Sequence, residues 1–452
     1  MRTLIVVHGF PPQAQGGSEI YAHAHARTLQ RQYGDDVLVL TREHDPAKPE
    51  YAVRRERLDG LQIVRINNTF KDARTFEDTY RNETIDGLAA SVIDDFEPDV
   101  AHIHHLTCLS TGVVAELARR RIPRFLTLHD YWLICHRGQL LDVHYQCCEN
   151  ATRDAAVMCS GCLDAAVASP AGFVGARVFR AMTRHAPGPA ALLRRGGLRF
   201  AKVLGADTNG LAARRTSHMK DLCDSITHFI APCRFMRDRF LAFGIASERI
   251  TVADYGFDAG PFRSTRQTPG GAPLRVGFLG SLMISKGPHV LLEAISRLPH
   301  DALSVAIYGS PTPYHGDDSY RDRLAPLVAQ PNVTVHGPIP QADVPKALAA
   351  LDVLVVPSIW LENSPLVIHE AFLAGVPVIA SNVGGIPELV THGINGLLFR
   401  AGDVDDLARA LQHVVADRGL VQQLREGIPS VRSIETDVQE LRAMYQRTLT
   451  TG

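Results

Sequence analysis

Glu362 and Glu370 bracket the expected start of a helix, in a segment that follows an apolar strand. Ser364 is a suitable N-cap and Pro365 a suitable first helical residue, so the pattern predicts a helix over about 365–374. The free N–H groups and the positive dipole end at such a start favour an anion such as a diphosphate. Because Glu370 lies about 7.5 Å further along the axis, one carboxylate can face the sugar side of a nucleoside diphosphate and the other its ribose hydroxyls.

The turn between the two glutamates supplies the rest of this expected binding site, namely Asn363, Ser364, Pro365 and Leu366. Two glutamates at this spacing could also be solvated surface residues, because such a pair arises by chance in a chain of this length. The strand, the cap and the helix around the pair favour binding over that alternative.

A second turn, residues 280–287, also follows an apolar strand and opens a helix. Gly280 permits close approach of the backbone to a ligand, and Ser281 follows it. Lys286 supplies a compact positive charge that suits phosphate. A loop lysine is usually only solvated, but beside the first motif Lys286 is predicted to bind the donor phosphates.

The elements that must position these residues alternate between strand and helix in both halves of the chain. This alternation predicts an α/β fold with two Rossmann-like, doubly wound domains facing a central cleft, where ligands of such sheets bind. We expect an N-terminal, acceptor-side domain over 1–265 and a C-terminal nucleotide-sugar donor domain over 274–420, with a linker at 263–273. Residues 421–452 are expected to form a helical segment that packs back across the linker.

Composition excludes several other classes of protein. The 452 residues are 45% hydrophobic and 21% charged with a net charge of −1, which is ordinary for a globular protein and gives no sign of nucleic-acid binding. The N-terminal apolar run is too short for a signal peptide, and no stretch has the roughly 18–20 apolar residues that a membrane span needs. We therefore expect a cytoplasmic protein whose eight cysteines are reduced.

Together these motifs resemble those of family 4 of the retaining glycosyltransferases, which have the GT-B fold. The Glu-x7-Glu signature of the family corresponds to Glu362 and Glu370, and its phosphate loop to residues 280–287. Residues 375–381 and 384–388 complete the block. The match covers both halves of the chain and is strongest over 274–411.

The resemblance implies a nucleoside-diphosphate sugar donor, anomeric retention and no metal required at the diphosphate. Carried over to this chain, Glu370 would hold the ribose, Glu362 would contact the transferred sugar, and Lys286 would stabilise the leaving diphosphate. The family usually has an arginine where this chain has Ser281. This difference removes one positive side chain that would contact the phosphates, so stabilisation of the leaving group would depend more heavily on Lys286.

The first half of the chain contributes further candidates to the same site. Gly16 and Gly17 open a helix and correspond to the glycine loop of the family, so their N–H groups are expected to face the donor phosphates, although they could be plain loop glycines. His129 ends a strand and matches the His-Asp pair of the family, which predicts a catalytic contact with the donor sugar rather than a structural role. His104 and His105 are weaker candidates for acceptor contacts.

Five cysteines crowd the insertion expected at about 135–221, and Cys159 and Cys162 have the CxxC spacing of a metal knuckle. With Cys135 and Cys148 (or its neighbour Cys147) they could form a structural zinc site. The alternative is that these reduced cysteines only pack, since the spacing between the pairs is irregular.

Residues 165–206 of the same insertion contain no acidic residue but several basic ones interspersed with apolar side chains, namely Arg177, Arg180, Arg184, Arg194, Arg195, Arg199 and Lys202. This composition fits either an interfacial helix pair on the cytoplasmic face of an anionic membrane or a solvated helical excursion from the first domain.

The function predicted from these observations is a retaining, hexosyltransferase-type glycosyltransferase of glycan or polysaccharide biosynthesis. Its acceptor would be a glycan, a lipid-linked molecule or a small molecule. A nucleotide-sugar epimerase of the same architecture and a non-catalytic protein that binds nucleotide sugars remain as alternatives. A dinucleotide-dependent dehydrogenase is disfavoured, because the first strand is not followed by GxGxxG.

Overall fold

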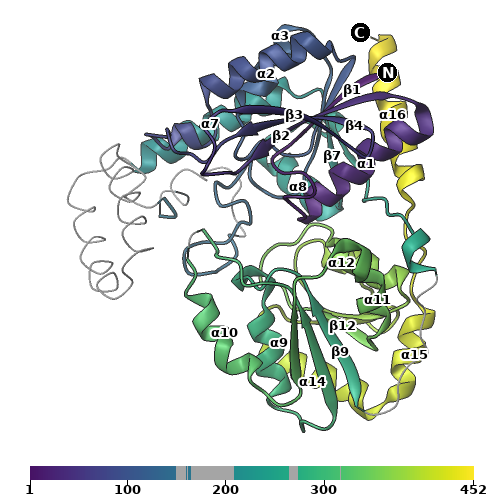
Figure 1. Cartoon of the computed structure of the whole chain (residues 1–452). Coiled ribbons are helices and arrows are strands. Elements are labelled where there is room, and N and C mark those ends of the chain that lie inside the picture. Colours follow the sequence, from purple (N-terminus) through teal and green to yellow (C-terminus); the bar gives the residue numbers. More distant parts are fainter. Residues whose placement is uncertain (149–158, 160, 164–207, 264–272, 316, 452) are drawn as a thin grey trace.

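The chain folds around two separate sheets, which lie in the two halves of the molecule in Figure 1. The computed structural model describes residues 1–148, 159, 161–163, 208–263, 273–315 and 317–451. The basic segment 165–206 therefore lies outside the described residues, as does most of the expected linker.

The first sheet has eight strands in the order β3-β4-β2-β1-β5-β6-β7-β8. All neighbouring pairs are parallel except β3 with β4. The strands are β1 (Arg2–Val7), β2 (Asp36–Glu43), β3 (Val53–Leu58), β4 (Leu61–Asn67), β5 (Val100–Ile103), β6 (Arg124–Thr127), β7 (His228–Ala231) and β8 (Ile250–Val252).

Helices cover both faces of this sheet, because successive side chains of the buried strands point to opposite faces. Leu4 and Val6 of β1 pack with the helices on one side, and Ile5 and Val7 pack with those on the other. The first side is covered by α2 (Glu83–Phe96), α3 (Gly112–Arg119), α7 (Thr208–Ser225) and α8 (Arg234–Phe243), and the second by α1 (Gly17–Tyr33) and α16 (Ile434–Thr451).

The second sheet is entirely parallel, with six strands in the order β11-β10-β9-β12-β13-β14. Its strands are β9 (Leu274–Leu279), β10 (Leu303–Tyr308), β11 (Val333–Gly337), β12 (Val353–Val356), β13 (Val378–Ser381) and β14 (Gly396–Phe399). One face packs on α9 (Pro288–Ile295), α10 (Tyr320–Val328) and α14 (Val404–Ala416), and the other on α11 (Val344–Ala349), α12 (Leu366–Leu373) and α13 (Ile386–Leu389). The prediction of an α/β fold with two doubly wound units is confirmed.

The end of the chain returns to the first half of the molecule. After α14, α15 (Arg418–Glu426) lies beside the second sheet, and α16 then packs along α1, as Figure 1 shows in yellow against purple. The Asp437 carboxylate of α16 accepts hydrogen bonds from the Tyr21 hydroxyl, at 2.7 Å, and from the Gly256 N–H, at 3.1 Å. The last helix is therefore part of the core of the first half. Within the described residues, no helix is both long enough and apolar enough to cross a membrane.

Candidate active site

Helix α12 begins at Leu366, in the segment that the sequence singled out. Its N-cap is Pro365, with φ −61° and ψ 118°, and no side chain caps the helix. The prediction that Ser364 is the N-cap and Pro365 the first helical residue is therefore wrong. The Ser364 hydroxyl instead donates a 2.6 Å hydrogen bond to Asp254 of the first half and lies 2.8 Å from the His369 ring. The Ser364 hydroxyl thus makes a bond between the two halves of the molecule and does not cap the helix.

Two glycines shape the turn that precedes α12. Gly384 has φ +61°, and a Cβ there would lie 2.2 Å from the Glu362 carbonyl oxygen. The next residue, Gly385, donates its N–H to that same carbonyl at 2.7 Å. A side chain at Gly385 would meet the Asn363 carbonyl at 2.0 Å. This close approach of two backbones holds Glu362 and Asn363 in place and requires glycine at both positions.

The Glu362 carboxylate is buried, with 2% of the side chain exposed, and it is fully engaged on one oxygen. The Ser358 hydroxyl donates to Oε1 at 2.6 Å, and the Lys286 ammonium donates to the same atom at 2.8 Å. Lys286 also lies 5.2 Å from the centre of the Trp360 ring. The structure thus brings together Lys286 and Glu362, which are 76 residues apart.

The loop that carries Lys286 packs directly on the strand-to-helix segment. A 3-10 turn, Ile284–Lys286, ends at Gly287, which has φ +67°. A Cβ at Gly287 would lie only 1.9 Å from the Pro357 carbonyl oxygen. Before the turn, Gly280 closes β9 with φ +147°, and Ser281 is exposed beside it.

Glu370 lies on α12 with 7% of its surface exposed. Its Oε1 accepts a 2.7 Å hydrogen bond from the Gln341 side-chain amide. Burial raises the pKa of Glu370 above its usual value, and the Gln341 bond offsets only part of that effect. The second carboxyl oxygen has no partner that the described residues supply, so it can accept a bond from a ligand.

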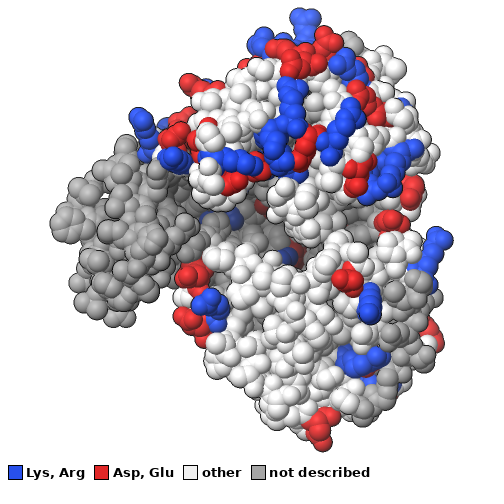
Figure 2. Space-filling model, viewed as in Figure 1, with Lys and Arg blue, Asp and Glu red and all other residues white. Residues whose placement is uncertain are grey.

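The start of α1 contacts the start of α12 where the two halves of the molecule meet. Figure 2 shows a hollow between these halves. Gly16 is the N-cap of α1 and Gly17 its first residue. A Cβ on Gly17 would lie 3.2 Å from the Leu366 side chain, so the two helix ends touch. Glu19, in the first turn of α1, pairs with His8 at 3.2 Å. Burial alone would raise the pKa of Glu19, but the hydrogen bond and charge of His8 outweigh it and hold the pKa at about 2.

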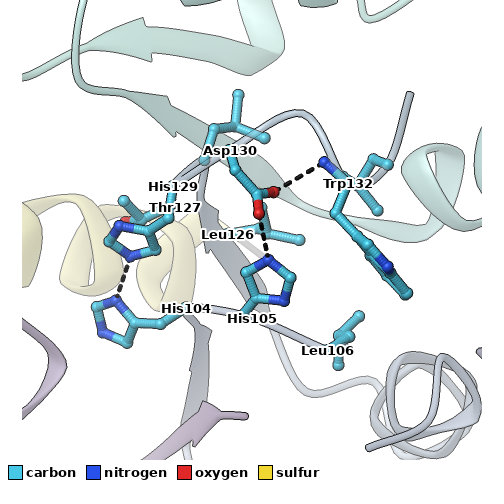
Figure 3. Close-up of a pocket in the computed structure, with 10 residues that line it drawn as sticks. His104, His105, Leu106, Leu126, Thr127, His129, Asp130 and Trp132 are labelled. Atoms are coloured by element: carbon cyan, nitrogen blue, oxygen red, sulfur yellow. Dashed lines mark hydrogen bonds and ion pairs between the residues drawn. The ribbon is translucent and has the colours of Figure 1, made fainter. Parts of the chain in front are cut away.

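His129 follows β6, is half-buried, and lines the pocket of Figure 3 beside His104. Its Nδ1 lies 2.9 Å from the Tyr255 hydroxyl, and its Nε2 lies 3.0 Å from Nδ1 of His104. Burial lowers the pKa of His129 to about 3, so the imidazole is neutral at physiological pH. Both ring nitrogens of His129 are therefore occupied, and neither is free to bond to a sugar hydroxyl in this structure. This differs from the sequence-based expectation that the ring contacts the donor sugar.

His104 is likewise engaged on both nitrogens, by His129 and by His25, which lies 3.1 Å from its Nε2. His104 is also buried, so the expectation that its ring contacts the acceptor is wrong. His105 lines the small pocket of Figure 3 together with His104, and its Nε2 is 3.2 Å from the Asp130 carboxylate. Burial would raise the pKa of Asp130, but His105 outweighs that effect and lowers it.

Asn363 joins the two halves at this point. Its side-chain amide donates to the main-chain carbonyl of His129 at 2.6 Å and to the Tyr255 hydroxyl at 3.3 Å. His369 of α12 also lies 3.4 Å from Asp254. The sequence analysis missed Asp254 and Tyr255, although their position directly after β8, at the carboxyl end of the sheet, was a usable signal.

The predicted cysteine ligands are all among the described residues. Cys135 is buried, and Cys148, Cys159 and Cys162 are partly buried. Each of the last three lies near enough to Cys135 for a charge on that thiol to raise its pKa further. Among the described residues, no three of these sulfur atoms lie within 4.8 Å of one another, so the structure does not bring the four cysteines together as a ready metal site.

Two family profiles match the chain. Residues 266–430 match the profile described as glycosyl transferases group 1, and residues 16–156 match the glycosyl transferase 4-like domain. D-inositol 3-phosphate glycosyltransferase of Corynebacterium jeikeium is 35% identical over 184 residues, which cover 39% of this chain and 43% of that protein. The lipopolysaccharide core biosynthesis glycosyltransferase LpsE of Rhizobium meliloti is 34% identical over 170 residues, or 36% of this chain and 46% of that protein. The chain therefore aligns with less than half the length of these curated relatives.

Solved structures match over the whole length. The sucrose-phosphate synthase of Thermosynechococcus elongatus superposes with a TM-score of 0.68 at 17% identity, and covers 100% of both chains. Anabaena HepE in complex with UDP and glucose superposes with a TM-score of 0.64 at 17% identity, again over 100% of both chains. At such identities the likeness shows the fold, which is GT-B. With both halves matched by glycosyltransferase profiles, the chain belongs to the family 4 type of GT-B glycosyltransferases.

Proposed function

We propose that this chain transfers a sugar, with retention of anomeric configuration, from a nucleoside-diphosphate sugar bound in the cleft between its two sheets. The observation that carries the proposal is the meeting of two helix starts beside the Lys286–Glu362 pair. The names of the relatives, which include glycosyltransferases and a HepE complex with UDP and glucose, support the same donor class.

The proposed binding site for the diphosphate follows from the positive charges at the starts of α1 and α12. Each helix start carries the equivalent of about half a positive charge and several N–H groups without intrahelical acceptors. The starts of α1 and α12, at Gly17 and Leu366, together with the Lys286 ammonium, would oppose a diphosphate with about two positive charges. With these charges the proposed binding site needs no metal ion. They also compensate for the positive charge that is missing at Ser281.

The two glutamates would then act at opposite ends of the donor. Glu370 would accept hydrogen bonds from the ribose hydroxyls through its free oxygen, with Gln341 holding the other oxygen. Glu362, four residues before the start of α12, would contact the transferred sugar. Lys286, which now bonds to Glu362, is within reach of both the sugar side and the leaving diphosphate.

In the proposed reaction the bond between the anomeric carbon and the diphosphate oxygen breaks, and the diphosphate leaves with the electron pair. The acceptor oxygen bonds to the anomeric carbon on the same face, and its proton passes to a departing phosphate oxygen. Lys286 and the helix N–H groups stabilise the charge that develops on that diphosphate, which is where enzymes of this kind gain most of their rate. His129 would act as a positioning residue, because it holds Tyr255 and, through its carbonyl, Asn363.

A nucleotide-release screen over UDP-, GDP- and ADP-sugars, with a panel of glycan and lipid-linked acceptors, tests the proposal. We expect release from one nucleotide class, a glycoside product with retained configuration, and loss of both in Glu370→Ala. Glu293→Gln, on the neighbouring helix α9, serves as the matched control and should remain active. Interconversion of nucleotide sugars without a glycoside product would indicate an epimerase and overturn the proposal.

A further inference from the structure

A continuous hydrogen-bond chain starts at Asn363, in the turn before α12, and leads into the core of the first half of the molecule. The Asn363 side-chain amide donates to the Tyr255 hydroxyl at 3.3 Å. This hydroxyl lies 2.9 Å from Nδ1 of His129, and Nε2 of His129 lies 3.0 Å from Nδ1 of His104, the contact drawn in Figure 3. The turn before α12 is thus connected to a buried histidine to which the proposed reaction gives no role.

The chain continues from His104 to the last helix of the protein. Nε2 of His104 lies 3.1 Å from Nδ1 of His25 on α1, and Nε2 of His25 lies 3.3 Å from the Tyr445 hydroxyl on α16. The same hydroxyl bonds to Nδ1 of His102 on β5, and Nε2 of His102 lies 2.7 Å from the Thr127 hydroxyl. All five of these side chains are buried, with at most 1% exposed. Their polar atoms must therefore find their partners within the chain.

The four imidazole rings of the chain are neutral. Among the described residues, none of them forms an ion pair with a carboxylate. Burial lowers the pKa of His25 and that of His129 to about 3. It also holds the pKa values of His102 and His104 well below the usual value. A neutral imidazole carries a single N–H, so it donates at one nitrogen and accepts at the other. The direction of one hydrogen bond therefore decides the direction of the next.

Asn363 fixes the direction of the whole chain. Two main-chain contacts identify its amide atoms, because the nitrogen donates to the His129 carbonyl at 2.6 Å and the oxygen accepts the Ser364 N–H at 2.5 Å. An amide nitrogen only donates, so the Tyr255 hydroxyl accepts from Asn363 and gives its own proton to Nδ1 of His129. His129 is then the Nε2–H tautomer, and the same step repeated along the chain makes every ring an Nε2–H tautomer. The opposite direction would aim the Tyr255 proton at a donor.

We propose that this chain positions Asn363 and Tyr255 for sugar transfer and couples them to α16 through Tyr445. The role rests on the proposed function, because Asn363 directly follows Glu362, the residue expected to contact the transferred sugar. The histidines and Tyr445 would be positioning residues that act through Asn363 and Tyr255. A break at any link leaves a buried donor or acceptor unpaired and loosens the hold on the turn before α12.

A metal ion is the alternative occupant of part of this chain. His25, His102 and His104 each offer a ligand atom, and these atoms lie within 4.8 Å of one another. Every nitrogen of the three rings, however, already has a hydrogen-bond partner in this structure. Complete pairing favours the hydrogen-bond chain. Metal analysis of the purified full chain separates the two, since about one equivalent of bound zinc that is lost in His102→Gln would overturn the proposal.

The tautomers can be measured on the full chain without substrate. Long-range proton–nitrogen correlation spectra of protein labelled at its histidine nitrogens distinguish the Nε2–H from the Nδ1–H tautomer, and single histidine replacements assign the rings. We expect the Nε2–H tautomer at all four positions. A protonated ring or an Nδ1–H tautomer at any of them would overturn the proposal, and this result needs no variant that might fail to fold.

Asn363→Asp tests whether position 363 sets the direction. The substitution places an acceptor where the amide donates, so the Tyr255 hydroxyl should donate to it and all four rings should switch to the Nδ1–H tautomer. A folded Asn363→Asp protein with unchanged tautomers would contradict the proposal.

Tyr445→Phe tests the coupling to catalysis. It removes the hydroxyl that joins His25 to His102, and it should lower kcat by roughly 2-fold to 30-fold, the range that such networks transmit, with a smaller effect on the donor KM. Tyr320→Phe is the matched control, because its hydroxyl also lies against a buried histidine, 2.7 Å from Nδ1 of His289, but in the second half of the molecule.

The control should lose a similar amount of stability and keep the wild-type kcat. Equal kcat values in Tyr445→Phe and Tyr320→Phe would overturn the positioning role. The tautomers are measured without substrate, so a protein that transfers no sugar would still show them. Failure of the proposed function and failure of the chain are therefore distinguishable.

Discussion

Lys286 and Glu362 form a 2.8 Å ion pair shortly before the start of α12, so the two residues expected to act on the diphosphate and on the sugar are held by each other. Glu362 is buried and also receives the Ser358 hydroxyl, whereas the Lys286 side chain is 34% exposed. The lysine is thus the more exposed partner, and we expect it to turn to a diphosphate while Ser358 keeps the carboxylate in place.

Lys286→Ala should lower kcat by about 100-fold to 1,000-fold, because it removes the side-chain cation that opposes the leaving diphosphate. The donor KM should change much less than kcat. Lys286→Arg should recover part of the rate, since it restores the charge with a different shape. Steady-state kinetics of all three proteins checks this, and a change confined to KM would contradict a role in the chemical step.

Glu370→Gln should weaken binding of the nucleoside diphosphate by about 10-fold or more, the usual effect of losing a hydrogen bond to a charged acceptor. The wild-type affinity should also fall as pH is lowered, beginning at a higher pH than for an ordinary glutamate, because burial raises the pKa of this carboxyl and its ionised form is the better acceptor. Calorimetric titration across pH measures both effects. An equally pH-dependent affinity in Glu370→Gln would assign the effect to another group.

Gly287→Ala should destabilise the protein more than Gly34→Ala does. Both glycines have a positive φ, +67° and +64°, so both substitutions carry a conformational cost of roughly 1–2 kcal/mol. Only at Gly287 would the new Cβ also meet a backbone atom, the Pro357 carbonyl oxygen at 1.9 Å, whereas nothing lies within 4 Å at Gly34. Chemical denaturation of the two variants isolates that collision. Equal losses of stability would show that the Lys286 loop does not pack on Pro357 in this way.

Glu19→Gln should remove a contribution to stability that depends on pH. The pKa of Glu19 is about 2 in the folded protein against an ordinary value of 4.5, which corresponds to about 3 kcal/mol of stabilisation by the ionised form. For a lowered acid pKa, that contribution is fully present above about pH 4.5 and is lost as pH falls toward 2. The free energy of unfolding of wild type and variant should therefore converge in acid. A gap that does not vary with pH would argue against ionisation as its cause.

The fold was predictable because its signals are local and repeated. Buried parallel strands read as short apolar runs between amphipathic helices, and this was enough to establish both doubly wound units. The sequence reading gave no sign of β3, Val53–Leu58, because arginine and glutamate occupy its four central positions and it pairs antiparallel at the sheet edge. Such a strand has no apolar run to mark it.

The site was predictable only as far as its residues belong to one contiguous motif. Ser364 has the composition of an N-cap, but its hydroxyl bonds to Asp254, a residue 110 positions away. His129 has the position of a sugar ligand, but its ring nitrogens are taken by His104 and by Tyr255, which is 126 positions away. In both cases the local sequence pattern favours one role for the side chain, but a contact with a distant segment gives it another.

A structure of the chain with a bound nucleoside diphosphate tests the central claim most directly. The account predicts a pyrophosphate against the first N–H groups of α12, close to Gly17 and Lys286, with the ribose hydroxyls on Glu370. A nucleotide bound at any other place, with the start of α12 empty of phosphate, would contradict it.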